Sequence, residues 1–316
     1  MNPFLTLNRI EFPVTYRCNS RCKHCQLGPS KRALRPAAIE AELAAQIVRD
    51  VATAYPVRSV MTWGGEPLLF PDVVCAIHAA ARECGIASRD IISNIGWPRE
   101  EVQFREIAVQ LAESGVCGIY ISVDAFHQEY IPLSVVERNV RSLAEAGIEK
   151  LVWNPCWVVS REHDNPWNRR TRAILDALVH LPAIEDPGNT VQPNGNAPVW
   201  LSEYMPPKSP FPAGTCGDLP YTGRLDQVTS ISVEPDGRVS ICDEWMIIGN
   251  AFHKNIVEIL NNYDPYQIPE MKAILEGGVA GLAALARQKG VEADPEGYYS
   301  VCDMCRSIRR RLGQVG

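Results

Sequence analysis

Short apolar runs alternate with longer amphipathic stretches over the first two hundred residues. The apolar runs predict β-strands at residues 10–15, 59–63, 90–94, 118–123, 151–158 and 190–192. The stretches between them predict helices at residues 37–54, 71–84, 100–115, 134–147 and 166–180. Such alternation is typical of βαβ units in a parallel sheet. We therefore predict an α/β fold, a partial (β/α)6 TIM-like barrel, although periodicity alone does not separate a barrel from an open sheet.

The pattern changes after the last of these helices. Residues 182–222 are rich in proline and predict an irregular connector, a length that is uncommon unless it is functional, for instance as a cover over a substrate. Residues 228–233 and 238–242 flank a Glu-Pro-Asp-Gly turn and predict a β-hairpin. Helical segments are predicted at residues 256–262, 269–276 and 279–289, followed by a cysteine pair at residues 302–305 and a short basic tail. We therefore expect two domains, a barrel at residues 1–200 and a small hairpin-plus-helix domain at residues 201–316.

Composition narrows the classes of function. The chain has 316 residues and a net charge of −6, which argues against a broad nucleic-acid interface. No apolar run reaches the roughly 18 residues of a membrane-spanning helix, and no secretory signal is visible. We expect a cytoplasmic protein with neither nucleic acid nor membrane as a partner.

Cysteine usage points to metal binding. There are 11 cysteines, an odd number, and without an export signal a disulfide framework is not expected. Cys18, Cys22 and Cys25 follow the first predicted strand, and three thiolates in one loop can hold three corners of a cubane-like iron–sulfur cluster, leaving one iron open. The alternative is a zinc site, which usually has paired CxxC units and a fourth protein ligand.

This CxxxCxxC motif resembles that of the radical S-adenosylmethionine (radical SAM) superfamily, and the resemblance extends over about residues 10–125. Family members usually carry an aromatic residue just before the third cysteine, where this chain has His24. The resemblance implies that His24 is a planar contact near the adenine of SAM. An imidazole is also a possible metal ligand.

A second motif, Gly64-Gly65-Glu66-Pro67, is similar to the family's GGEP motif, which receives the ammonium group of SAM. Glycines let a backbone approach a ligand closely, and an anion suits an ammonium, although a lone Gly-Gly is more often only a turn. Small polar residues end the third and fourth predicted strands, and the resemblance implies that they contact the SAM ribose and carboxylate, unless they are ordinary turn and cap residues: Ser93, Asn94, Ser122 and Asp124.

A second cysteine set lies in the last third of the chain: Cys216, Cys242, Cys302 and Cys305. The order of hairpin, cysteine and helix resembles the C-terminal auxiliary-cluster extension of radical SAM enzymes, in its short twitch form rather than the longer SPASM form. Four cysteines would close a [4Fe–4S] cluster with no open iron, which favours electron transfer or a structural role. A structural zinc site with four cysteine ligands is the alternative.

Cys156 lies near the end of the fifth predicted strand. It could donate a hydrogen atom to a substrate radical, as a thiol does in some radical SAM epimerases. The alternative is a buried, inert cysteine that only packs.

The resemblance implies an oxidoreductase or maturase with two [4Fe–4S] clusters, which cleaves SAM reductively to a 5′-deoxyadenosyl radical and takes electrons from a flavodoxin or ferredoxin type reductant. The leading prediction for its substrate is a ribosomally made peptide, modified by epimerisation or cross-linking. One alternative is a small molecule such as an aminosugar or cyclitol, which would be oxidised. A non-enzymatic Fe–S or zinc-binding electron-transfer module is the alternative from another class, and Glu66 argues against it.

Overall fold

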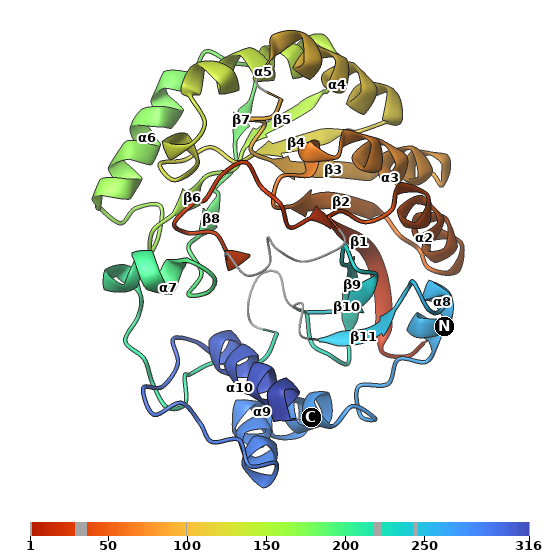
Figure 1. Ribbon diagram of the computed structural model, residues 1–316, viewed down its shortest axis with the longest axis vertical. Coiled ribbons are helices and arrows are strands. Elements are labelled where there is room, and N and C mark those ends of the chain that lie inside the picture. The colour runs from red at the N-terminus through yellow and green to blue at the C-terminus, as the bar shows by residue number, and fades with distance from the viewer. Residues whose placement is uncertain (1, 29–36, 99, 218–222, 243–245, 316) are drawn as a thin grey trace. The chain divides into compact units, whose positions relative to one another are not determined.

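The computed structural model describes residues 2–28, 37–98, 100–217, 223–242 and 246–315 (Figure 1). The chain divides into two compact units. We call Arg9–Tyr204 with Val233–Gly237 the barrel unit, and Met1–Asn8, Met205–Ser232 and Arg238–Gly316 the second unit. The predicted functional division into a barrel domain at residues 1–200 and a cluster domain at residues 201–316 stays a prediction.

The barrel unit contains a sheet of parallel strands in the order β1-β2-β3-β4-β5-β7. Their bounds are β1 Leu5–Thr15, β2 Ser59–Gly64, β3 Ser88–Ser93, β4 Gly118–Ile121, β5 Lys150–Trp153 and β7 Ile184–Glu185. The strand β1 begins in the second unit and continues in the barrel unit. Because all six strands run the same way, their carboxyl ends meet at one edge, where ligand sites of such sheets lie.

Figure 1 shows helices along the outer side of these strands. They are α2 Ala41–Ala54, α3 Pro71–Glu83, α4 Glu101–Ser114, α5 Leu133–Glu145 and α6 Pro166–Leu178. Ile10, Phe12 and Val14 of β1 are fully buried, and because alternate residues of a strand share a face they form one apolar face toward the core. The prediction of an α/β fold with a parallel-strand, partial-barrel sheet is confirmed.

The fifth and sixth predicted strands differ from the strands of the structure. The run at residues 151–158 is divided into β5 and β6 Cys156–Trp157, and Pro155, which has no backbone N–H to donate, lies between them. The strand β7 pairs with β5, whereas β8 Asn189–Thr190 pairs with β6 in a separate two-stranded sheet. The connector is therefore more ordered than expected, and it also contains α7 Ala197–Trp200.

The second unit contains the hairpin strands β9 Val228–Val233 and β10 Arg238–Ser240, together with β11 Ile247–Asn250, which is antiparallel to β10 and was not predicted. Its helices are α8 Ile256–Asn261, α9 Pro269–Gln288 and α10 Val301–Val315. The two helical segments predicted at residues 269–276 and 279–289 form α9, interrupted at Gly278, whose φ of 60° and ψ of −153° are not helical. Among the described residues, no helix is long and apolar enough to cross a membrane.

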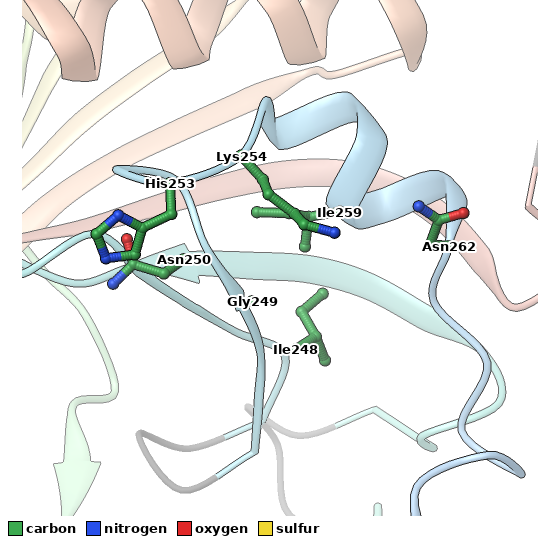
Figure 2. Close-up of a pocket in the computed structure, with 7 residues that line it drawn as sticks. All are labelled: Ile248, Gly249, Asn250, His253, Lys254, Ile259 and Asn262. Carbon is green, nitrogen blue, oxygen red and sulfur yellow. The ribbon is translucent and has the colours of Figure 1, made fainter.

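A surface pocket lies within the second unit (Figure 2). Side chains and backbone from the end of β11, the following turn and α8 form it: Ile248, Gly249, Asn250, His253, Lys254, Ile259 and Asn262. None of the residues predicted to bind a cofactor is part of its lining. The candidate site therefore has to be sought in the barrel unit.

Candidate active site

The three cysteines of the first motif lie in one loop, the cluster loop (residues 17–28), directly after β1. Cys22 is 4% exposed, and Cys18 and Cys25 are half-buried. The backbone N–H of Cys25 donates to the Cys22 carbonyl at 3.2 Å, which closes a turn between them. The Cys18 Sγ accepts from the Ser20 N–H at 3.4 Å and from the Asn94 side chain at 3.8 Å. Such donors stabilise a thiolate, so the loop suits three cluster ligands.

The two glycines after β2 fit against the base of the cluster loop. The Gly65 N–H donates to the Thr15 carbonyl at 2.7 Å, and the Glu66 N–H donates to the Arg17 carbonyl at 2.8 Å. A Cβ at Gly64 would lie 2.3 Å from the Thr15 oxygen, and one at Gly65 would lie 2.0 Å from the Arg17 oxygen. The close approach that these glycines permit is therefore to the chain that enters the cluster loop.

Glu66 links the ends of β2 and β3. Its side chain is fully buried; Oε1 accepts from the Ser93 hydroxyl at 2.7 Å and from the Leu68 N–H at 3.0 Å, and Oε2 accepts from the Asn94 N–H at 2.8 Å. Burial raises the pKa of this carboxyl group, while its three hydrogen bonds lower it. Pro67, which is also buried, begins a short 3-10 helix. The predicted contact of Glu66 with the SAM ammonium stays a prediction.

Asn94 continues this link to the cluster loop. It is 3% exposed, and its side-chain N–H group donates to the Asn19 Oδ1 at 2.8 Å as well as toward Cys18 Sγ. Its own Oδ1 accepts from the Gly96 N–H at 2.8 Å. Sequence reasoning missed Asn19, although an amide side chain between the first two cysteines was a visible signal.

Asp124 anchors the loop after β4. It is fully buried, and its Oδ1 accepts from the Phe126 and His127 N–H groups at 2.9 and 3.0 Å. Its Oδ2 accepts from His127 Nδ1 at 2.9 Å and from the Cys156 N–H at 3.1 Å. Ligand atoms of His24, Asp124 and His127 lie within 4.8 Å of one another, a spacing compatible with a metal ion. The carboxylate accepts four donors of this chain and so orders the loop after β4, and its predicted contact with SAM stays a prediction.

Charge pairing controls protonation here. Burial alone would raise the pKa of Asp124, but the neighbouring His127 holds it well below its usual range. Burial alone would lower the pKa of His127, but the Asp124 carboxylate raises it above the ordinary value. Burial lowers the pKa of His24 to about 4, so this imidazole is neutral at pH 7. His127 was not among the predicted site residues, and its only signal was a histidine three positions after a strand-end aspartate.

Aromatic rings in contact connect the cluster loop to the loop after β4 and to α6. The ring centroids of His24 and Phe126 are 4.7 Å apart, and those of Phe126 and Trp167 are 4.8 Å apart at an interplanar angle of 23°. Lys23 lies over the Trp167 ring, 4.6 Å from its centroid, and pairs with Glu129 at 2.9 Å. The planar side chain predicted at His24 therefore has a protein partner, and its contact with adenine stays a prediction.

Ser122 and Cys156 are the remaining predicted site residues of the barrel unit. The Ser122 N–H donates to the Ser93 carbonyl at 2.8 Å, which places it beside the end of β3. Cys156 begins β6 and is half-buried. Its backbone N–H donates to Oδ2 of Asp124, the oxygen that also accepts from His127. Burial and the negative charge of Asp124 raise the pKa of the Cys156 thiol well above its usual value. This thiol is therefore protonated at neutral pH.

Three buried polar atoms at this end of the barrel have no hydrogen-bond partner among the described residues: His24 Nδ1, Gln128 Nε2 and Asn194 Oδ1. Buried polar groups almost always have a partner, in protein, water or ligand. Gln128 donates nothing from this nitrogen, while its Oε1 accepts from the Asp124 N–H at 2.8 Å. With three thiols in the adjoining loop, these atoms fit a site for an iron–sulfur cluster and a polar ligand such as SAM.

The second cysteine set lies in the second unit. Cys302 and Cys305 lie in the first two turns of α10, and their spacing of three places them on the same helical face. Cys242 follows β10, and Cys216 lies earlier, before β9; all four are half-buried. A cluster shared by these four cysteines stays a prediction.

Comparison with known proteins agrees with this geometry. Residues 12–169 match the Radical SAM superfamily. The GTP 3′,8-cyclase of Listeria monocytogenes is 23% identical over 220 residues, which cover 67% of this chain and 62% of that protein. The same enzyme from Desulforamulus reducens is 27% identical over 124 residues, 39% of this chain and 36% of that protein. The chain thus matches less than two thirds of the length of these relatives.

A solved structure described as "Native anSMEcpe with bound AdoMet" shares the fold. It superposes with a TM-score of 0.53 over 98% of both chains at 13% sequence identity. At this identity the likeness concerns the arrangement of strands and helices, and it agrees with the partial barrel described above.

Proposed function

The chain belongs to the Radical SAM superfamily, and on that premise we propose that it epimerises a residue of a peptide substrate, with Cys156 as the hydrogen-atom donor. Membership implies a [4Fe–4S] cluster and SAM as cofactors. Bound together, these two groups supply a 5′-deoxyadenosyl radical that removes hydrogen from an unactivated carbon. The protein's own residues would bind and orient these two groups, and Cys156 would supply the hydrogen atom that completes the reaction.

The cluster loop supplies the ligands and the barrel edge orients them. Cys18, Cys22 and Cys25 would hold three irons of the cluster and would leave the fourth iron without a cysteine ligand from this loop. Asn94 fixes the Cys18 end of the loop, and Glu66 in turn fixes Asn94. The buried atoms without partners, such as His24 Nδ1, would complete their hydrogen bonds on the bound ligand.

The position of Cys156 is the observation that supports epimerisation, because its N–H donates to Asp124 Oδ2 at 3.1 Å and places the thiol beside the candidate site. A substrate carbon radical that takes the hydrogen atom of an S–H group becomes a closed-shell C–H, and the sulfur becomes a thiyl radical. The donor must therefore carry its proton, and burial beside Asp124 keeps it on the sulfur. A net oxidation, as in an aminosugar dehydrogenase, or a ring closure within one molecule has no use for such a donor.

Restoring the thiol requires one electron and one proton. Cys216, Cys242, Cys302 and Cys305 would hold a second [4Fe–4S] cluster, which would supply this electron once a flavodoxin or ferredoxin type protein had reduced it. The proton comes from the surrounding water or from protonated groups of the site.

A purine nucleotide is the second candidate substrate, because the curated relatives are named GTP 3′,8-cyclase. The two candidates predict different labels in D2O. A cyclase consumes GTP and needs no thiol donor, whereas an epimerase places one solvent deuterium on the inverted carbon.

The test incubates reduced, reconstituted enzyme with SAM in D2O, either with GTP or with synthetic peptides encoded by reading frames beside its gene. We expect 5′-deoxyadenosine and one deuterium in a peptide. The Cys156→Ala variant should still produce 5′-deoxyadenosine but no deuterated epimer. Cys75→Ala is the matched control, because Cys75 is a half-buried thiol of raised pKa on α3. Consumption of GTP, or full epimerisation by Cys156→Ala, would contradict the proposal.

A further inference from the structure

The turn that contains Asn196, far along the chain, is hydrogen-bonded to the cluster loop. Asn196, which directly precedes α7, donates its backbone N–H to the Cys25 carbonyl at 2.9 Å. Its side-chain Nδ2 donates to the Cys22 carbonyl, also at 2.9 Å and across 174 residues of sequence. Residue 196 is therefore bonded to both carbonyls that bracket the turn between the second and third cysteines.

The residue before it allows this contact. Gly195 has a φ of +56°, in the left-handed region that favours glycine. A Cβ at this position would lie 2.2 Å from the Cys25 oxygen and 2.4 Å from the Gln26 oxygen. These neighbours are backbone atoms, so a larger residue would have to push the cluster loop aside.

We propose that residues 194–196, which we call the latch turn, position the cluster loop and so set the geometry of the cluster's open iron. The two hydrogen bonds end on the backbone carbonyls of two ligand cysteines, so Asn196 acts through the loop and is a positioning residue. Loss of the latch would let the Cys22–Cys25 turn relax, and errors of about 1 Å at a reacting centre can cost on the order of 100-fold in rate.

The inference rests on the cluster of the superfamily and goes beyond the proposed epimerisation. It does not depend on the identity of the substrate, since SAM alone reports on the open iron. It also gives the connector a role that the sequence pattern alone did not suggest, because the latch turn lies within residues 182–222.

Three substitutions test the latch. Asn196→Ala removes the side-chain donor and leaves the backbone bond. Asn196→Asp keeps the shape but turns an acceptor toward the Cys22 carbonyl, so its effect should be larger. Gly195→Ala introduces the clash with Cys25. The matched controls are Asn189→Ala, whose amide bonds to Asn154 at 3.0 Å, and Gly147→Ala, whose φ is +91° with no atom within 4 Å of its added Cβ.

The readouts are iron per chain, the electron paramagnetic resonance (EPR) spectrum of the reduced protein with and without SAM, and the rate of SAM cleavage without substrate. Only a cluster with an open iron changes its EPR spectrum when SAM binds. We expect Asn196→Ala to retain iron, to weaken the SAM-induced spectral change and to slow SAM cleavage about fivefold to tenfold. Asn196→Asp and Gly195→Ala should weaken the spectral change and slow cleavage more strongly. Both control variants should match wild type in all three readouts.

A merely structural turn would lower the melting temperature but leave the SAM-induced spectrum of the iron-loaded fraction as in wild type, and that result would overturn the proposal. Failure of the proposed function is distinguishable. If wild-type protein epimerises no peptide, the EPR comparison of wild type with Asn196→Ala still decides the latch.

Discussion

At the scale of single residues, the buried carboxylate of Glu66 links the ends of β2 and β3 to the cluster loop. It accepts hydrogen bonds from Ser93, Leu68 and Asn94, and Asn94 in turn bonds to the cluster loop. A buried acceptor with three donors is costly to change, because each donor that loses its partner remains desolvated.

We therefore predict that Glu66→Gln destabilises the fold by about 1–3 kcal/mol, since its amide NH2 would face one of these donors. Affinity for SAM should fall in the same variant because Asn94 loses its orientation. Thermal unfolding and SAM titration by calorimetry measure the two effects. The control is Glu83→Gln, a 61% exposed side chain paired with Arg49, which should cost less than about 0.5 kcal/mol. Equal melting temperatures for the two variants would contradict this role of Glu66.

The pair of Asp124 and His127 predicts a pH dependence of stability. The pKa of His127 is raised in the fold, so its contribution is complete below its unfolded pKa near 6.5 and is lost as pH rises through the folded value. The pKa of Asp124 is lowered, so its contribution is present above its unfolded value near 3.8 and is lost only in stronger acid.

The difference in melting temperature between wild type and His127→Gln should therefore be largest between about pH 4 and 6.5 and should shrink toward pH 9. Differential scanning calorimetry across this range, with the exposed position His180→Gln as control, makes the measurement. A difference that stays constant from pH 5 to pH 9 would show that the pair is not ionised as described.

At the scale of elements, the joint between β2 and the cluster loop depends on two glycines. Gly65→Ala would place a methyl group against the Arg17 carbonyl, so we predict a loss of about 1–3 kcal/mol and a lower iron content after reconstitution. Gly85→Ala is the control, because a Cβ added at Gly85 has open space around it and only the positive φ of +71° opposes the substitution. It should lose at most about 1 kcal/mol and no iron. Normal iron loading of Gly65→Ala would contradict the close fit.

Elements were predictable where periodicity was sustained. The helices between the first five strands lie within a few residues of their expected positions, because each presents an apolar face at helical spacing. The C-terminal helix α10 was taken for a cysteine pair with a basic tail, although Val301, Met304 and Ile308 already form a buried seam. The strands β7 and β11 have two and four residues, too short for a pattern, and β8 at Asn189–Thr190 only overlaps the strand predicted at residues 190–192. The pairing of these short strands is set by tertiary contacts.

The residues of the candidate site also divide into those that the sequence marks and those that only the folded chain brings together. The cysteines of the cluster loop and the residues at the ends of β2 to β4 could be proposed from the sequence because motif spacing marks them. Asn19, His127 and Asn196 were missed, since each acts through a contact that the chain forms only after folding. No local pattern announces a hydrogen bond that spans 174 residues.

At the scale of the whole molecule, the two cysteine sets belong to different units. We predict that the double variant Cys302→Ala/Cys305→Ala loses about four irons per chain but still cleaves SAM without substrate. Cys22→Ala should also lose about four irons and should lose SAM cleavage entirely. Iron and sulfide analysis, together with chromatography of the products, separates the two. Zinc in place of iron at the second set would contradict a second [4Fe–4S] cluster.

Radical chemistry is tested most directly by the formation of 5′-deoxyadenosine from SAM by anaerobically reconstituted, dithionite-reduced protein, compared with Cys22→Ala. We expect 5′-deoxyadenosine and methionine in equal amounts from wild type and neither from the variant. Iron-loaded wild-type protein that leaves SAM intact under every reductant, or a Cys22→Ala variant that cleaves it equally well, would contradict radical chemistry at the Cys18–Cys25 loop.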